Sequence, residues 1–214
     1  EGETPLFCLS EALAAKRDIS KIPNVITKNS GSETRIAHRG EDMAFLPAPD
    51  FGGLPLDLYD ENNNVSVSLT FETSRGCYWS KCAYCVDLPL PKPAYRCKDA
   101  RLIVRDIKEL KEKYQANMLL LGDPGMSPRQ MLEVSRAIID SNVDIAWWVM
   151  ARLDPGFTPD IFRLAHRAGL KKINFGFESA SDAICDLLSK GNRRERSGRV
   201  IRDCAQAGIE VDLQ

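Results

Sequence analysis

The strongest chemical signal in this chain of 214 residues is a group of three cysteines, Cys77, Cys82 and Cys85. Their spacing is Cys-x4-Cys-x2-Cys, and thiolates this close together are typical ligands of zinc and of iron–sulfur clusters. Three thiolates would leave one iron of a 4Fe-4S cluster open to bind a substrate. A disulfide framework is not expected, because the chain's seven cysteines come without a secretion signal.

A structural zinc site is the alternative interpretation of these cysteines. Zinc usually takes four protein ligands, and Cys97 would supply the fourth thiolate. A zinc site, however, gives no reason for the loop to follow the first strand of a repeated β/α array. The remaining cysteines lie in helical patterns and are expected to be small buried apolar residues: Cys8, Cys185 and Cys204.

Strand and helix patterns alternate from residue 65 onward. Apolar runs predict five strands, at residues 65–71, 117–121, 145–150, 172–177 and 209–213. The helical patterns between them include two clear starts, where an N-cap oxygen precedes a proline: Ser127-Pro128 and Thr158-Pro159. This alternation predicts an α/β fold with a parallel sheet, either open or curved into a barrel arc. The cysteine loop would then lie at the carboxyl edge of the sheet, where sites are built.

The first 64 residues differ from the rest of the chain. A short helical pattern through Leu6, Leu9 and Leu13 is followed by a stretch rich in proline and glycine. We expect residues 1–64 to form a connector that does not fold alone, and residues 65–214 to form the core domain.

Charge and hydropathy exclude several classes of partner. The formal net charge of −1 gives no general attraction to nucleic acid or anionic lipid. Arg193, Arg194 and Arg196 are expected to be a solvated helix start rather than a nucleic-acid patch. No apolar run reaches the ~18 residues of a spanning helix, and no secretion signal is seen, so we expect a cytoplasmic protein without a membrane partner.

The loop from Arg75-Gly76-Cys77 to Cys82-Ala83-Tyr84-Cys85 resembles that of the radical S-adenosylmethionine (SAM) superfamily. The usual spacing there is Cys-x3-Cys-x2-Cys, with an aromatic residue before the last cysteine; this sequence has one more residue in the first gap. The resemblance covers residues 65–214. It implies a partial TIM-like (β/α) barrel of parallel strands, with about five of six strands present.

Parts of the connector extend the resemblance. Residues 18–24 and 46–59 are similar to the segment that joins a cobalamin-binding domain to the radical SAM domain. The resemblance therefore implies a fragment of a cobalamin-dependent member, lacking the upstream cobalamin-binding domain and the C-terminal part. Methyl transfer is the commonest activity of such members. Radical SAM chemistry without cobalamin, such as sulfur insertion or an isomerisation, stays open.

The same resemblance implies roles for the cysteines. Cys77, Cys82 and Cys85 would ligate three irons of a 4Fe-4S cluster, and the amino and carboxylate groups of SAM would chelate the fourth. The reduced cluster would cleave SAM to a 5′-deoxyadenosyl radical that abstracts a hydrogen. An electron donor such as flavodoxin or ferredoxin is implied as a partner. The substrate, a small molecule or a peptide, is not identified.

Further SAM contacts are implied at the ends of the strands. Tyr84 would pack against the adenine, unless it is an aromatic core residue. Gly122 and Asp123 stand where the family contacts the SAM amino group, although they also fit a simple turn. Arg152 would pair with the SAM carboxylate or ribose side, or else form a surface pair with Asp154.

The end of the fourth expected strand is similar to the Gly-x-Glu-Ser segment of the family. That segment contacts the ribose and the amino acid part of SAM, which implies this role for Glu178 and Ser179. A charged Glu178 that closes an apolar strand is hard to explain by packing. Ser181 is expected to be the N-cap of the next helix instead.

Overall fold

The computed structural model describes most of the chain, namely residues 1–28, 40–59, 68–85 and 94–214. It divides into two compact units, Glu1–Leu46 and Pro47–Gln214. Val65 and Val67 of the first expected strand lie outside the described residues.

The smaller unit contains the helix expected near the start of the chain, α1 (Glu3–Ala14). The backbone N–H and hydroxyl of Thr4 both donate to the carboxylate of Glu41, at 2.9 and 2.8 Å. The larger unit begins inside the expected connector rather than at residue 65. There the ring of Phe51 meets that of Tyr114 edge-on, with 5.6 Å between their centroids. Part of the expected connector therefore packs on the core unit.

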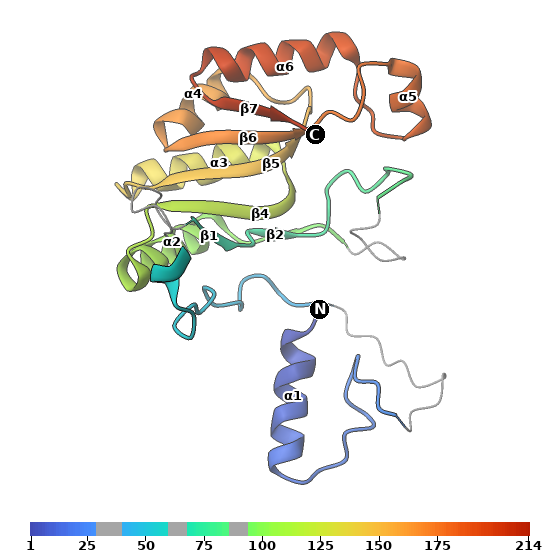
Figure 1. The fold of residues 1–214 in the computed structure, drawn as a ribbon, viewed down its shortest axis with the longest axis vertical. Coiled ribbons are helices and arrows are strands. Elements are labelled where there is room, and N and C mark those ends of the chain that lie inside the picture. The colour runs from blue at the N-terminus through green and yellow to red at the C-terminus, as the bar shows by residue number, and fades with distance from the viewer. Residues whose placement is uncertain (29–39, 60–67, 86–93) are drawn as a thin grey trace. The chain divides into compact units, whose positions relative to one another are not determined.

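Five parallel strands form the main sheet of the larger unit among the described residues, in the order β1-β4-β5-β6-β7 (Figure 1). Their bounds are β1 Ser68–Phe71, β4 Met118–Met126, β5 Ala146–Arg152, β6 Leu170–Gly176 and β7 Glu210–Leu213. The β1–β4 pair keeps a regular register, with Leu69 opposite Leu119. The register shifts between Leu121 and Met126 where β4 pairs with β5, and between Trp147 and Trp148 where β5 pairs with β6. The α/β fold with five parallel strands is confirmed.

A small antiparallel pair stands beside the main sheet. It joins β2 (Ser74–Arg75) to β3 (Arg96–Cys97), with Ser74 opposite Cys97. The cysteine loop starts directly after β2. In Figure 1 the arrowheads of β4, β5, β6 and β7 point toward the side on which this loop and α5 lie. The loop therefore lies at the carboxyl edge of the sheet, as expected.

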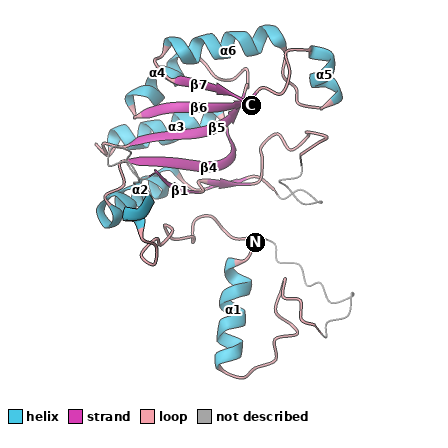
Figure 2. Ribbon diagram, in the orientation of Figure 1, coloured by secondary structure: helices cyan, strands magenta, loops and turns pink. Residues whose placement is uncertain are grey.

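Helices follow the strands and pack side by side, α2 with α3, α3 with α4 and α4 with α6 (Figure 2). Their bounds are α2 Ala100–Tyr114, α3 Pro128–Asp140, α4 Pro159–Arg167, α5 Asp182–Leu187 and α6 Arg194–Gln206, and a short 3-10 helix, η1, spans Leu56–Tyr59. Three of these helices begin with the side-chain caps that the sequence predicts. The capping residues are Ser127, Thr158 and Ser181.

The hydrophobic core lies between this layer of helices and one face of the sheet. Along β4, Leu119 and Leu121 are fully buried, whereas Leu120 between them is only half-buried. On β5, Trp147 is fully buried and its neighbour Trp148 is half-buried, as expected for side chains on opposite faces. Burial of one face fixes the strand register. It thereby fixes which side chains end at the carboxyl edge.

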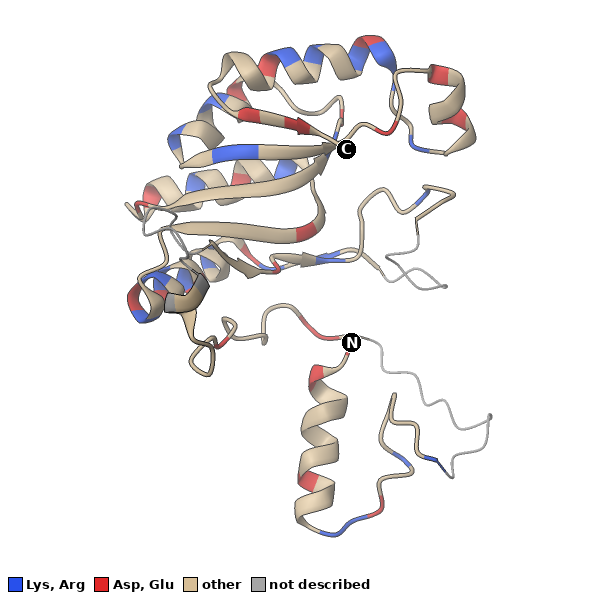
Figure 3. Ribbon diagram, viewed as in Figure 1, with Lys and Arg blue, Asp and Glu red and all other residues tan. Residues whose placement is uncertain are grey.

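Charged residues of both signs are mixed over the helices of the larger unit (Figure 3). At the start of α6, Arg193 pairs with Asp186 at 2.7 Å, and Arg194 and Arg196 are exposed, as expected for a solvated helix start. In the part of the chain that the structure describes, no helix has the length and apolar character needed to cross a membrane.

Candidate functional site

A cavity of about 340 Å³ opens where the cysteine loop meets the ends of β5 and β6. Its volume falls in the usual range for small-molecule and cofactor sites. The lining residues are Cys77, Cys82, Tyr84, Cys85, Pro124, Met150, Ala151, Arg152, Asn174, Gly176, Glu178, Lys190 and Gln214. The three cysteines selected from the sequence thus line one cavity, together with Tyr84, Arg152 and Glu178.

The start of the cysteine loop is held by the carboxylate of Asp123 in β4. This carboxylate accepts hydrogen bonds from the backbone N–H groups of Thr73 and Ser74, at 2.7 and 2.8 Å, and from the Thr73 hydroxyl. Gln130 of α3 donates its amide to the same carboxylate at 3.0 Å. All of these groups are buried. One side chain therefore joins the loop, the sheet and the helix layer.

The expected contact of Gly122 and Asp123 with the SAM amino group is not supported by this geometry. Asp123 is completely buried, does not line the cavity, and already accepts from several donors. At Gly122 a Cβ would lie 2.9 Å from Cγ2 of Thr70, so the glycine allows β1 and β4 to pack closely. Both residues support the loop instead of facing a ligand.

Replacing Asp123 by asparagine is expected to lower the free energy of unfolding by about 1–3 kcal/mol, because an amide N–H₂ would meet the donors that the carboxylate satisfies. Urea unfolding measures the change. The exposed Asp140→Asn at the end of α3 is the matched control and should shift stability by less than about 0.5 kcal/mol. Unchanged stability combined with weaker SAM binding would restore a ligand role for Asp123.

A lysine that the sequence reasoning did not select lies at the centre of the cavity's polar wall. Lys190, between α5 and α6, donates to Glu178 Oε1 at 2.9 Å and to the Tyr84 hydroxyl at 3.1 Å. Burial alone would raise the pKa of Glu178, but the hydrogen bonds from Tyr84 and Lys190 lower it overall. Burial would likewise lower the pKa of Lys190, and its bonds to Glu178 and Tyr84 raise it overall. Both side chains are therefore charged at neutral pH.

The backbone of Glu178 is strained. Its φ is +62°, in the left-handed region that costs a residue with a side chain roughly 1–2 kcal/mol. The N–H groups of Phe177 and Glu178 both donate to the carbonyl of Gln214, at 2.9 and 2.8 Å. Strained backbone that the surrounding structure holds in place is common at functional sites. The fold thus directs a charged side chain toward the cavity at a cost in stability.

Arg152, at the end of β5, is buried and lines the same cavity. Its Nη2 donates to the carbonyl of Lys190 at 2.6 Å, and its Nη1 lies 3.5 Å from Asp154 Oδ2. Among the described residues, neither Arg152 Nε nor the buried Oδ1 of Asn174 has a hydrogen-bond partner. Buried polar atoms are rarely left without partners. Both residues line the cavity, where a polar ligand would supply hydrogen-bond partners.

Three polar residues of the cavity were not predicted from the sequence, namely Asn174, Lys190 and Gln214. Ser179 joins Gly122 and Asp123 as an expected residue that does not line the cavity. Asn174 is a polar residue inside an apolar strand, and Lys190 precedes Gly191, whose φ is +75°. In the sequence, the polar Asn174 within an apolar strand and the glycine after Lys190 were the features that could have indicated these two residues. Ser179, by contrast, does not line the cavity, since its hydroxyl accepts from the N–H of Ser181 at 3.1 Å and shapes the turn before α5.

The zinc alternative requires Cys97 beside the other three thiols. Among the described residues, no group of three or more His, Cys, Asp or Glu side chains is arranged to hold a metal ion. Cys97 is exposed on β3 and does not line the cavity. The zinc alternative with Cys97 as fourth ligand is therefore not supported.

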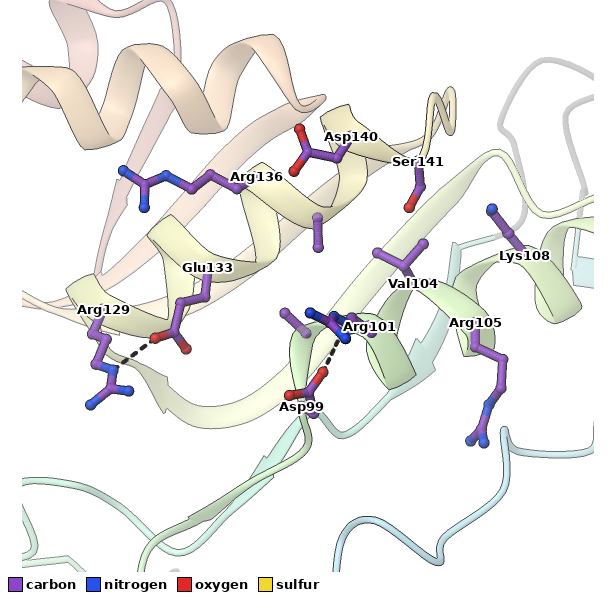
Figure 4. A pocket seen from close by; sticks show the side chains of 12 residues that line it. Asp99, Arg101, Val104, Arg105, Lys108, Arg129, Glu133, Arg136, Asp140 and Ser141 are labelled. Carbon is purple, nitrogen blue, oxygen red and sulfur yellow. Dashed lines mark hydrogen bonds and ion pairs between the residues drawn. The ribbon is translucent and has the colours of Figure 1, made fainter.

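A second, larger cavity of about 870 Å³ lies between α2 and α3 (Figure 4). Its wall is largely charged, and Arg129 pairs there with Glu133 at 2.8 Å. No cysteine and no residue predicted to bind a cofactor lines it. The predicted cluster ligands therefore line the smaller cavity and not the larger one.

The fold and the cavity together define a β/α domain with a cavity of cofactor size beside a group of thiols. The family model of the radical SAM superfamily matches residues 71–213, and the chain therefore belongs to this superfamily. Membership implies a 4Fe-4S cluster and SAM as cofactors.

Individual relatives are distant. An uncharacterised methyltransferase of Pyrococcus horikoshii is 22% identical over 215 residues, which are 99% of this chain and 46% of that protein. Among solved structures, the cobalamin-dependent SAM radical enzyme OxsB has a TM-score of 0.77 at 19% identity, covering 100% of this chain and 32% of its own. The radical SAM methyltransferase TsrM of Kitasatospora setae has a TM-score of 0.76 at 18% identity, covering 99% and 44%. The chain thus spans less than half of each protein.

Proposed function

We propose that this chain is the SAM-cleaving part of a radical SAM enzyme. The observation that carries the proposal is the single cavity in which Cys77, Cys82 and Cys85 stand beside a cationic, an anionic and an aromatic side chain. A 4Fe-4S cluster with SAM would supply the one-electron chemistry that forms a carbon radical. The chain's own task is to bind, orient and shield these groups.

The donor set fits this pair of cofactors. The three cysteines would ligate three irons of the cluster. SAM carries an amino group, a carboxylate and a sulfonium. The cavity offers Glu178 as an acceptor for the amino group, and Arg152 with Lys190 as donors to the carboxylate. Asn174 Oδ1 adds an acceptor that has no partner among the described residues. The amino and carboxylate groups of the ligand would each find a complementary side chain.

The same cations act on the thiols. Burial raises the pKa of Cys82, and the charges of Lys190 and Arg152 offset part of that increase. Iron is ligated by the thiolate rather than the thiol. Lys190 and Arg152 therefore have two roles in the proposal, since they favour ligation and bind the SAM carboxylate.

Anaerobic reconstitution with ferrous iron and sulfide tests the proposed function. We expect broad absorbance near ~400 nm and roughly four irons per chain. Addition of SAM and a low-potential reductant should then release 5′-deoxyadenosine. A chain that takes up zinc but forms no cluster, or a cluster that binds no SAM, would overturn the proposal.

We further propose cobalamin-dependent methyl transfer as the activity of the whole protein, with a flavodoxin or ferredoxin as electron donor and a small molecule or peptide as substrate. The support is the similarity to an uncharacterised methyltransferase and the shared fold with OxsB and TsrM. The test uses the full reading frame. A longer protein that binds cobalamin and transfers a labelled methyl group from SAM would support this subclass, and SAM cleavage without methyl transfer or bound cobalamin would contradict it.

A further inference from the structure

Trp79 lies between the first two cysteines of the loop and is fixed on several sides. Its indole N–H donates to the carbonyl of Ser189 at 2.9 Å. The guanidinium carbon of Arg152 lies 3.9 Å from the centre of its ring, which is a close cation–π stack. Lys81, on the loop surface, lies 4.9 Å from the ring centre. The indole is therefore held by the turn before α6 and by the end of β5.

The turn itself is shaped for this ring. Gly191 has a φ of +75°, and a Cβ there would lie 2.5 Å from Cζ2 and 2.6 Å from Cη2 of Trp79. Real Cβ atoms essentially never come so close to other atoms. The indole therefore packs directly on the backbone at Gly191, and only glycine leaves room for it.

A second contact joins the same two segments on the other side of Cys82. The N–H of Ala83 donates to the carbonyl of Leu188 at 2.9 Å. Cys82 is thus bracketed, since Trp79 before it and Ala83 after it are both bonded to residues 188–191. Arg152 closes the arrangement, because its Nη2 donates to the carbonyl of Lys190 at 2.6 Å in that same turn.

We propose that Trp79 is a positioning residue that sets the place of Cys82 by locking the cysteine loop onto residues 188–191, with Arg152 as its stacking partner. It acts through Cys82 and does not touch the cavity. The four residues between Cys77 and Cys82 are accordingly an anchored segment and not a spacer. The effect of Trp79 on the cluster rests on the proposed function. Its effect on the position of the loop does not, because that position is measurable in the chain without a cluster.

The proposed role of Trp79 is tested by alkylating the apo chain with iodoacetamide and measuring the rate at each cysteine by mass spectrometry. In Trp79→Ala we expect Cys82 to react at least about fivefold faster, because loss of a ring anchor increases local opening. Cys97, exposed on another strand, should react at an unchanged rate and is the internal control. Lys81→Ala, in the same gap, should leave the rate at Cys82 within about twofold, because exposed cation–π pairs are weak.

Gly191→Ala supplies an independent variant at the partner surface. Gly191→Ala alone should raise the alkylation rate at Cys82 as Trp79→Ala does, because the methyl group of the alanine displaces the indole. In the Trp79→Ala background it should raise the alkylation rate at Cys82 less than it does in the parent, because the clash with the indole is gone and only the strain of the turn remains. Additive effects, or a Trp79→Ala rate within twofold of the parent, would overturn the proposal.

The cluster gives a second readout. In the reconstituted protein, Trp79→Ala should lose iron to a chelator several-fold faster, and Trp79→Phe should recover part of the difference, since it keeps a ring for Arg152 and loses only the N–H. If the parent itself forms no cluster, the proposed function fails, while the alkylation result still decides the position of the loop. Equal iron loss in the parent and in Trp79→Ala would contradict the role assigned to Trp79.

Discussion

A chain with Cys82→Ala is expected to assemble no 4Fe-4S cluster and to release no 5′-deoxyadenosine from SAM. Cys77, Cys82 and Cys85 line one cavity, and with only two thiolates a second iron of the cube loses its protein ligand. Iron content and absorbance near ~400 nm after anaerobic reconstitution measure the loss. Because Cys82 lies half-buried on a loop outside the core, far-UV circular dichroism should match that of the parent.

Cys97→Ala is the matched control for this prediction. Cys97 is exposed on β3 and does not line the cavity, so its replacement should leave both the iron content and SAM cleavage unchanged. A cluster that survives Cys82→Ala would refute the assignment of this ligand. Metal lost from Cys97→Ala would instead point to the four-cysteine zinc site.

Glu178→Gly is expected to weaken SAM binding by about 10- to 100-fold while cluster assembly stays intact. A hydrogen bond or ion pair to a charged group contributes about 1.5–3 kcal/mol, which corresponds to this range of affinity. Glycine is the informative substitution, because it adopts the φ of +62° without strain, so that the side chain is removed without a backbone penalty. Isothermal titration of the anaerobically reconstituted protein with SAM measures the affinity, and iron analysis measures assembly.

Two comparisons separate ligand binding from folding at this position. Glu178→Ala removes the same carboxylate but keeps the strained backbone, so it should bind SAM as weakly as the glycine variant and be less stable by about 1 kcal/mol. Glu210→Gln breaks an ion pair that lies outside the cavity, between Glu210 of β7 and Lys172 of β6 at 3.2 Å. This change should leave the affinity for SAM unchanged. Loss of the cluster in Glu178→Gly would assign Glu178 to folding.

The architecture was predictable because its signals are local. Alternating apolar residues mark the strands. Ser127 and Thr158 each mark a helix start, and each of these capping signals involves only the next three residues of the sequence. The position of the cysteine loop followed from these elements alone, since loops after parallel strands lie at one edge of the sheet.

The site was only partly predictable because its contacts are distant in sequence. A strand end places Asp123 at the correct edge, but the positions of Thr73 and Gln130 decide that its carboxylate turns inward. Lys190 reaches Tyr84 across 106 residues and depends on a turn after a short helix. Neither arrangement has a local sequence pattern. Residue type and strand position alone therefore assigned Asp123 to the ligand and gave no indication of Lys190.

The buried carboxylate of Asp123 also bears on the order of maturation. Its bonds to Thr73 and Ser74 span 50 and 49 residues, and a side-chain bond from Gln130 to Thr73 spans 57. Bonds of such sequence separation cannot form until the segment after β1, β4 and α3 have come together. The thiols are therefore arranged only once the sheet and α3 are in place, in contrast to small zinc domains, which fold around their metal. If the proposed function holds, cluster insertion is a step undergone by an already folded protein.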